Sequence, residues 1–594
     1  MGNVNSSIAQ NVPNDFFKSK VLGHPSGLFV LFFTEMWERF SYYGMRALLV
    51  LFLTSAIIGD NPGWGWDREN ALALYGSYTA LAYLTPILGG YFADKIIGYR
   101  WAVVVGALLM TLGHASMAVE THSFFLYMGL ILLVIGNGFF KPNMTSILSE
   151  MYKTHPEKKD GAYTIFYMGV NAGAFLGMLL CGYLGEKVGW AWGFGLAGIF
   201  MLVGMLQFYF TQDIFGNIGK KPVKGQEKEI DESHLSEQER QRNPFTKFDT
   251  ILIALVSIVA LVWVINDPVS KIGGTDLFNF KVGSLTGSNF VILCTLGLFI
   301  FLLIKRISQY SPFLRDRMIA IIILAFITIF FWASFEQAGG SMTIFAKDYT
   351  NRILEGSSKS IFNVVNTLIT IVPMAIISFV LVKLFRQTYS KYALGNIILA
   401  VGFVIIWGIV IYMLKQQYVE EKAEVPATWF GILNSLFIIS LAPLVSKIWE
   451  SKFNPPATIK NGIGMILLGI GFGALAFGAS AIPQGAKVAS VSMIWLVIAY
   501  LFHTLGELFI SPVGLSYVSK LVPARMIAMM FGVWYLAIAI GNKIAGKMGG
   551  EIDKITAQYD MKTFFLIFTL IPMGLGVLVM LLTPILRKLM HGVK

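Results

Sequence analysis

Seven charged side chains lie unambiguously inside long apolar stretches of this sequence, and these are the residues best suited to chemistry. A charge within a membrane span is costly, so it faces a cavity or an opposite charge and marks an ion or substrate path. The four acids and three bases nearly balance, as a desolvated functional cluster requires. They are Glu35, Glu38, Arg39, Arg46, Lys141, Glu336 and Glu507.

Four of these charges share one predicted helix with Tyr42 and Tyr43. At about 100° per residue, positions 35, 38, 39, 42 and 46 fall within about 100° of arc, so the helix presents one polar stripe. Stripes that only join membrane helices usually carry Ser, Thr or Asn. Three charges within five residues therefore favour a proton or ion relay.

Lys141 and Glu507 each lie close to a proline in otherwise apolar runs. Pro142, with nearby Gly and Asn residues, and Pro512 both weaken a helix. We therefore expect broken helices at these points, whose backbone groups line a cavity within the membrane.

The elements that must position these residues are membrane helices. The chain has 594 residues, 55% hydrophobic and 13% charged, whereas soluble domains carry about 25% charged residues. Apolar runs of about 20 residues, roughly 16 in number, are long enough to span a bilayer as helices. This composition excludes a soluble enzyme, a nucleic-acid binder and a disordered chain. Cys181 and Cys294 form neither a disulfide framework nor a metal site, and no cofactor is expected.

Roughly twice as many Lys and Arg fall on one side as on the other when the spans alternate, which places both termini in the cytoplasm. The polar, mixed-charge stretch after the sixth span divides the chain into two bundles. The predicted segments are a tail at 1–26, a six-helix bundle at 27–211, a linker at 212–248, an inserted hairpin at 249–306, a second bundle at 318–586 with another hairpin at 361–414, and a tail at 587–594. We expect the hairpins to fill lipid-facing space.

The segments EMWERFSYYGMR (35–46) and GGYFADKIIGYR (89–100), with several others, resemble motifs of the proton-dependent oligopeptide transporters, a family of the major facilitator superfamily. The segment 89–100 (GGYFADKIIGYR) is similar to the superfamily loop signature through Gly90, Asp94, Lys95, Gly98 and Arg100. EMWERFSYYGMR at 35–46 resembles the family's first-helix signature. Further matches are 74–94, GNGFFKPNMTSILSEMY (136–152), FYMGVNAGAF (166–175), FWASFEQAGGS (331–341), GELFISPVGLSYVSKLVP (506–523) and GVWYLA (532–537).

This resemblance implies an all-α membrane protein with the major facilitator fold, two six-helix bundles and additional hairpins, or 14 to 16 spans. It implies proton coupling by Glu35, Glu38, Arg39, Lys141 and Glu507. It also implies gate pairs Arg46–Glu336 and Lys141–Glu507. The substrate-binding residues implied are Tyr42, Tyr43, Arg46, Tyr83, Lys141, Asn171, Trp332, Asn434, Glu507 and Trp534.

The chain departs from the family at three places. Gly76 stands where mammalian members carry a histidine, so protonation rests on the carboxylates. Ser435 and Gly431 replace residues common beside Asn434, and Phe335 precedes Glu336 where some bacterial members carry an acid. The additional apolar pair at 361–414 is either an inserted hairpin, which we prefer, or includes the eighth core helix at 361–385.

The resulting hypothesis is import of di- and tripeptides with protons, by alternating access, through a monomer in the bacterial inner membrane. The alternative is a transporter of another small solute, such as nitrate or a drug, on the same scaffold. An intramembrane enzyme is disfavoured because HExxH, GxSxG and GxxxxGK[ST] are absent. A non-transporting receptor is the remaining rival.

Overall fold

The computed structural model describes residues 20–221, 235–452 and 454–593. The predicted tails at 1–26 and 587–594 and the linker at 212–248 therefore lie partly outside the described residues. Within the described part of the linker, the residues EQER form the short helix α8 (Glu237–Arg240). Ser236 caps this helix through Glu239 in a capping box, which satisfies two backbone N–H groups at its start.

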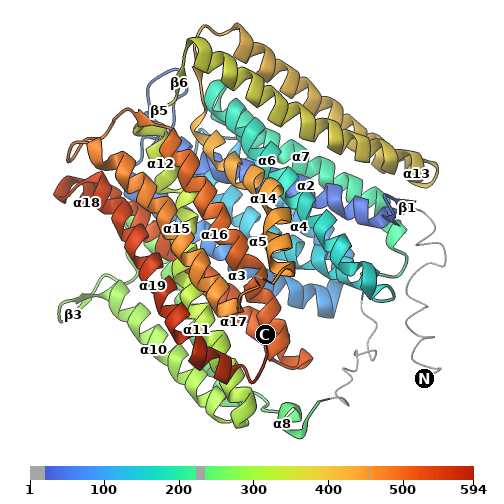
Figure 1. Ribbon diagram of the computed structural model, residues 1–594, viewed down its shortest axis with the longest axis vertical. Coiled ribbons are helices and arrows are strands. Elements are labelled where there is room, and N and C mark those ends of the chain that lie inside the picture. Colours follow the sequence, from blue (N-terminus) through green and yellow to red (C-terminus); the bar gives the residue numbers. More distant parts are fainter. Residues whose placement is uncertain (1–19, 222–234, 453, 594) are drawn as a thin grey trace. The chain divides into compact units, whose positions relative to one another are not determined.

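Helices make up nearly all of the described chain (Figure 1). In order they are α2 (Ser26–Thr54), α3 (Arg68–Phe92), η1 (Ala93–Ile97), α4 (Tyr99–Met117), α5 (Ser123–Met151), η2 (Pro156–Lys158), α6 (Lys159–Lys187), α7 (Trp190–Thr211), η3 (Gln212–Phe215), α8, α9 (Lys247–Gly273), α10 (Gly287–Ser308), α11 (Pro312–Phe335), η4 (Glu336–Gly339), α12 (Ser341–Asp348), α13 (Gly356–Val419), η5 (Ala427–Gly431), α14 (Ile432–Glu450), α15 (Ala457–Gly478), η6 (Ala479–Ala481), α16 (Ile494–Leu521), α17 (Ala524–Gly550), α18 (Ile552–Gln558) and α19 (Met561–Leu589).

Strands are confined to two-residue stretches in the described loops. They are β1 (Lys20–Val21), β2 (His24–Pro25), β3 (Lys281–Val282), β4 (Leu285–Thr286), β5 (Thr350–Asn351), β6 (Ile353–Leu354), β7 (Ala423–Glu424) and β8 (Val491–Ser492). β1 pairs with β2, β3 with β4, and β6 with β7, each antiparallel.

Fourteen helices of the described chain are long and apolar enough to cross a membrane, counted by length and composition. The 29-residue α2 is not among them because it carries Glu35, Glu38, Arg39 and Arg46. The 64-residue α13 counts once, although Tyr392 (φ −131°, ψ 46°) divides it into two arms. These helices confirm the predicted all-α membrane fold.

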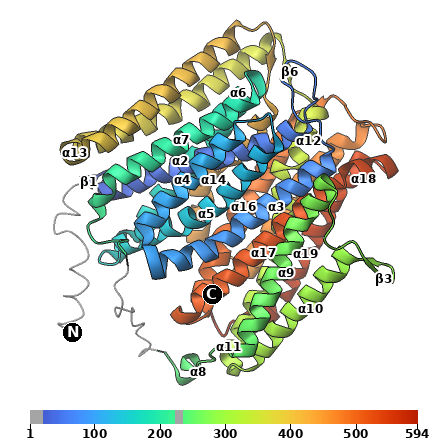
Figure 2. The same ribbon diagram turned by 180° about the vertical axis from the view of Figure 1, so that it is seen from behind.

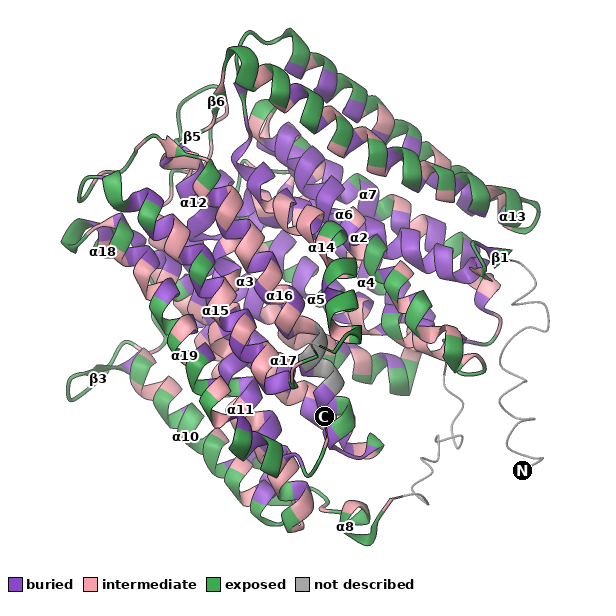
Figure 3. Ribbon diagram, viewed as in Figure 1, coloured by how far each residue is buried: buried purple, intermediate pink, exposed green. Residues whose placement is uncertain are grey.

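The chain forms two compact units, each assembled from separate segments. The first comprises Met1–Gly65, Leu84–Gln226 and Thr343–Ser440. Here α2 packs against α6 and α7, while α4 packs against α5 and α7. Its core is rich in aromatic rings, and Trp37 of α2 stacks on Phe200 of α7 with centroids 4.7 Å apart. Figure 3 shows α2 buried along nearly its whole length.

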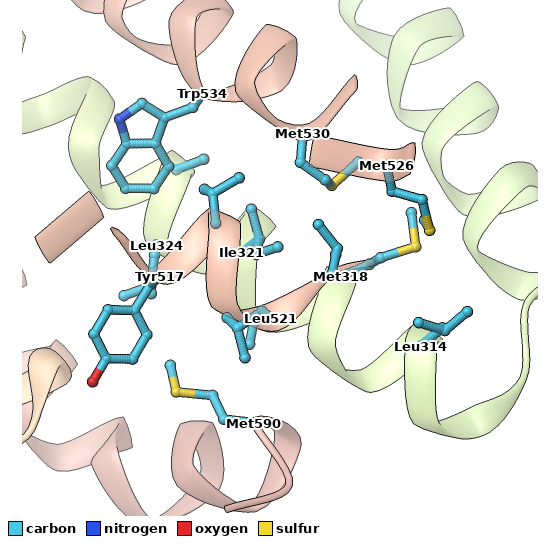
Figure 4. Close-up of a cluster of buried hydrophobic side chains, with 14 of the residues drawn as sticks. Leu314, Met318, Ile321, Leu324, Tyr517, Leu521, Met526, Met530, Trp534 and Met590 are labelled. Carbon is cyan, nitrogen blue, oxygen red and sulfur yellow. The ribbon is translucent and has the colours of Figure 1, made fainter. Parts of the chain in front are cut away.

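The second unit comprises Trp66–Tyr83, Glu227–Met342 and Leu441–Lys594. In this unit α15 packs against α16 and α19, and α11 packs against α17. The close-up in Figure 4 shows a cluster of buried apolar side chains from α11, α16, α17 and α19. Leu314 and Leu521 are fully buried there, beside Met318, Met530 and Trp534. The predicted bundles at 27–211 and 318–586 stay predictions. They divide the chain by sequence order, whereas these two units group segments by contact.

The two arms of α13 form a hairpin that packs along α7 (Figure 1). Amide side chains join the arms: Asn366 Nδ2 donates to Gln417 Oε1 at 2.7 Å, and Gln417 Nε2 donates to Asn363 Oδ1 at 2.8 Å. Trp407 Nε1 also donates to Ser378 Oγ at 3.0 Å. Hydrogen bonds of this kind hold helices together where apolar surface gives no preference over lipid.

The α9–α10 pair is a second hairpin, visible in Figure 2. At its base, Asp249 of α9 accepts from Lys305 Nζ at 2.8 Å and from Arg306 at 3.2 Å, both on α10. Most other side chains of the hairpin are exposed or half-buried.

Candidate functional site: an ion-pair cluster in the first helix

The polar stripe of α2 folds into a buried ion-pair cluster. Arg39 Nε lies 2.9 Å from Glu35 Oε1 and 3.0 Å from Glu38 Oε2, so one guanidinium serves two carboxylates. Glu35, Glu38 and Arg39 are 3%, 0% and 7% exposed. Glu35 and Arg39 are four residues apart and adjoin on a helix, which accounts for their contact, whereas Glu38 is the sequence neighbour of Arg39.

Lys141 of α5 lies within electrostatic reach of Glu38. With both acids ionised, the two carboxylates, Arg39 and Lys141 sum to zero charge. A proton added to either carboxylate leaves the set with one positive charge. A buried surplus charge is unfavourable unless an anion joins it. The cluster can therefore couple arrival of a proton to arrival of a carboxylate.

The tyrosines on α2 place aromatic faces beside its two arginines. The rings of Tyr42 and Tyr43 meet edge to face with centroids 5.2 Å apart. The Arg39 guanidinium lies 6.0 Å from the Tyr42 ring, and that of Arg46 lies 5.8 Å from the Tyr43 ring. These distances are at the outer limit for cation–π attraction, which orients an arginine without neutralising it.

The predicted helix break beside Lys141 is wrong. α5 runs from Ser123 to Met151 and contains Pro142. Glycines instead allow close helix crossings near Lys141. A β-carbon on Gly136 of α5 would lie 2.7 Å from the carbonyl oxygen of Gly106 of α4, and one on Gly89 of α3 would lie 2.0 Å from that of Gly138 of α5. They let α3 and α4 approach α5 closely. α16 likewise continues past position 512 to Leu521.

A break does occur at Glu336. α11 ends at Phe335, a 3₁₀ turn follows from Glu336 to Gly339, and α12 begins at Ser341. The run AGG directly after Gln337 is a signal of a helix end in the sequence. Glu336 is 2% exposed and accepts a hydrogen bond from Tyr75 of α3 at 3.3 Å. Tyr75 was absent from the predicted site.

Two predicted pocket residues of the second unit lie together. The rings of Tyr83 and Trp332 are tilted, with centroids 6.3 Å apart. Trp534 of α17 is 4% exposed and belongs to the apolar cluster in Figure 4, against which Tyr83 and Trp332 pack. Glu507 is half-buried on α16.

The two asparagines both belong to the first unit. Asn171 of α6 donates through Nδ2 to the carbonyl of Tyr167 in its own helix at 3.0 Å. Asn434 is half-buried on α14. The proposed gate pairs Arg46–Glu336 and Lys141–Glu507 each take one residue from each unit, so these pairings stay predictions.

The loop signature closes around an arginine. Gly98 has φ +82°, and a β-carbon there would lie 2.7 Å from the backbone of Lys220 and Lys221, so only glycine suits the position. Arg100 Nε donates to the carbonyl of Ile218 at 2.7 Å, and another of its nitrogens donates to that of Gly216. Asp94 and Lys95 lie in the π-helical turn η1, while Gly90 faces Pro142.

Fold and site together define a polytopic helical membrane protein with a buried, charge-balanced cluster. The POT family model matches residues 100–228 and 409–566. The chain is 32% identical to the peptide transporter YePEPT of Yersinia enterocolitica over 96% of both chains. It is 30% identical to the uncharacterized transporter YclF of Bacillus subtilis over 99% of both.

Solved structures agree with the sequence relatives. A crystal structure of the peptide transporter POT in complex with sulfate superposes with a TM-score of 0.69 at 28% identity, covering 98% of this chain and 99% of that one. A POT family transporter in complex with 5-aminolevulinic acid also gives 0.69, at 25% identity and with 98% and 99% covered. The chain therefore belongs to the POT family, and its fold is of the major facilitator type.

Proposed function

We propose that this protein imports di- and tripeptides together with protons, by alternating access. The observation that carries the proposal is the buried Glu35–Glu38–Arg39 set in a chain whose named relatives are peptide transporters. A dipeptide is a zwitterion of nearly fixed length with variable side chains. Fixed charges recognise its two ends, and aromatic walls accommodate the side chains that differ between peptides.

The carboxylate end of the peptide fits the first unit. Arg46 lies on the same face of α2 as the ion-pair cluster, and Lys141 adjoins it from α5. Protonation of Glu35 or Glu38 releases part of the attraction that holds Arg39 and Lys141. The freed positive charge then attracts the peptide carboxylate, so that proton and peptide favour the same state.

The amino end of the peptide is assigned to Glu507 and Asn434, with Asn171 on the peptide backbone. Tyr83, Trp332 and Trp534 provide apolar surface for side chains, and the contact of Tyr83 with Trp332 supports a shared wall. Glu336 and Arg46 would close one gate, and Lys141 and Glu507 the other. Tyr75 holds Glu336 in place when that gate is open.

The proton gradient supplies the energy, without a cofactor, and the peptide leaves intact. A proton contributes about 2.3 kcal/mol per 100 mV of membrane potential and about 1.4 kcal/mol per pH unit. We propose that the protein acts as a monomer in the bacterial inner membrane. The asymmetry of its Lys and Arg residues supports cytoplasmic termini.

The test is uptake of radiolabelled dialanine into proteoliposomes with and without an inward proton gradient. The internal concentration of dialanine should rise above the external concentration only with the gradient. Chromatography should recover unhydrolysed dialanine. Equal uptake under both conditions would refute proton symport. Because a family structure holds 5-aminolevulinic acid, competition by that compound tests whether a smaller zwitterion is preferred.

A further inference from the structure

The first turns of α3 are held by three ion pairs to segments far along the chain. Arg68 lies 2.7 Å from Asp553 of α18. Glu69 lies 3.0 Å from Lys271 of the α9–α10 hairpin through Oε1 and 3.0 Å from Lys554 of α18 through Oε2. The end of α3 is therefore fixed both to the hairpin and to the segment after α17.

About two turns further along α3, a buried lysine joins α3, the α9–α10 hairpin and α17. Lys543 of α17 donates to Ser77 Oγ of α3 at 2.7 Å and forms an ion pair with Asp267 of α9. Ser77 in turn donates to the carbonyl of Val264 in α9 at 2.9 Å. Side-chain exposure decreases along this path, from 32% at Glu69 to 25% at Lys271, 17% at Asp267 and 5% at Lys543.

The hairpin has little other attachment here. The buried residues of α9 are Asp249 and Leu252 near its start and Val264, Asn266 and Pro268 at this end. A buried charge pair is a costly way to attach a helix, since apolar packing of equal volume is often as stable or more so. Beside the buried Val264 and Pro268, the charge pair suits a contact that is made and broken more than a permanent one.

We propose that the α9–α10 hairpin is a gate element, in which Asp267 and Lys271 clamp the first half of α3 against Lys543 of α17. This inference rests on the proposed transport by alternating access. In the predicted division into bundles at 27–211 and 318–586, α3 and α17 belong to different bundles, so alternating access between those bundles must break this clamp. The hairpin thus takes part in the cycle and is more than filling for lipid-facing space.

Asp267 is the centre of the clamp. Three ammonium groups act on it, those of Lys543 and Lys547 on α17 and Lys271 on its own helix. The same Lys271 and Lys547 act on Lys543, and Glu69 of α3 pairs with Lys271. Removing the Asp267 charge leaves these cations to repel one another, whereas removing Asp267 and Lys543 together leaves no buried unpaired charge.

The clamp can be tested by the accessibility of Leu72, which is 1% exposed on α3 and faces Gly549 of α17. In the full-length C181A/C294S/L72C protein, reaction with a membrane-impermeant maleimide reports opening of α3 from α17. We expect D267N/K543M to react about tenfold faster and to lose most gradient-driven dialanine uptake. Folded D267N protein should react at least as fast as D267N/K543M.

Asp249→Asn is the matched control, because it removes a buried aspartate of the same helix whose charged partners, Lys305 and Arg306, lie within the hairpin. Its labelling rate should equal that of the parent. Parental labelling in D267N/K543M would overturn the clamp. Labelling does not require transport. If the parent protein fails to carry dialanine, the proposed function is refuted, but the labelling rates still test the clamp.

Discussion

Gly76 of α3 and Gly546 of α17 cross without room for a side chain on either. A β-carbon on Gly76 would lie 2.7 Å from the Gly546 Cα, and one on Gly546 would lie 2.5 Å from that of Gly76. This explains why a histidine cannot occupy position 76 in this chain. Proton binding therefore falls to other groups, and the crossing brings Ser77 against Lys543.

Replacing Gly76 with alanine should separate α3 from α17, because the nearest atoms are backbone and cannot move aside. Overpacking of this kind costs about 1–3 kcal/mol. The melting temperature of purified protein in detergent should fall. Gly408→Ala is the control, since a β-carbon there meets nothing within 4 Å. Equal melting temperatures for both variants would contradict the close crossing.

Neutralising one acid of the cluster should uncouple transport from the proton gradient. Glu35→Gln and Glu38→Gln each leave Arg39 with one ionised partner, so we expect at least about a tenfold loss of gradient-driven dialanine uptake. Exchange of internal for external peptide should persist, because it needs no net proton movement. Glu157→Gln, in the turn η2 outside the cluster, is the control. Retention of driven uptake by both cluster variants would exclude these carboxylates from coupling.

Arg46→Ala should weaken peptide binding by loss of a charge-assisted contact to the peptide carboxylate, about tenfold in apparent affinity. Arg46→Lys should fall between the parent and Arg46→Ala. Dialanine amide, which lacks the carboxylate, provides the control ligand: the variant and the parent should bind it equally well. If Arg46→Ala weakens binding of both ligands alike, the carboxylate assignment is wrong.

The loop carboxylate Glu424 should make stability depend on pH in the acid range. Burial raises its pKa, but Lys187 at 2.5 Å and Arg352 at 3.0 Å outweigh burial and hold the pKa below its ordinary value of 4.5. A carboxylate with a lowered folded-state pKa contributes stability above its unfolded pKa and loses it as pH falls through the folded value.

The melting temperature of the parent should therefore exceed that of Glu424→Gln at pH 6. The difference should shrink as pH decreases below about 4.5, the ordinary value. Glu355→Gln is a useful comparison, because that side chain is 59% exposed beside Lys422 and exposed pairs contribute little. A difference that is constant from pH 6 to pH 3 would show that Glu424 acts through something other than its charge.

The sequence by itself determined the family, the helical membrane fold and the polar stripe of α2. These follow from local rules: apolar runs of spanning length, and residues three and four apart that adjoin on any helix. The contact of Arg39 with Glu35, four residues away, was predictable for that reason, whereas its contact with its sequence neighbour Glu38 was not.

Only the tertiary structure decided how distant segments cross. The proline after Lys141 leaves α5 unbroken, whereas α11 ends at Phe335 before Glu336. Tyr75 meets Glu336, and Lys543 meets Asp267, across 261 and 276 residues of chain. Such pairs depend on where two helices approach, and this depends on glycine crossings such as Gly76 with Gly546. A pattern along one chain segment carries no information about the partner it will meet.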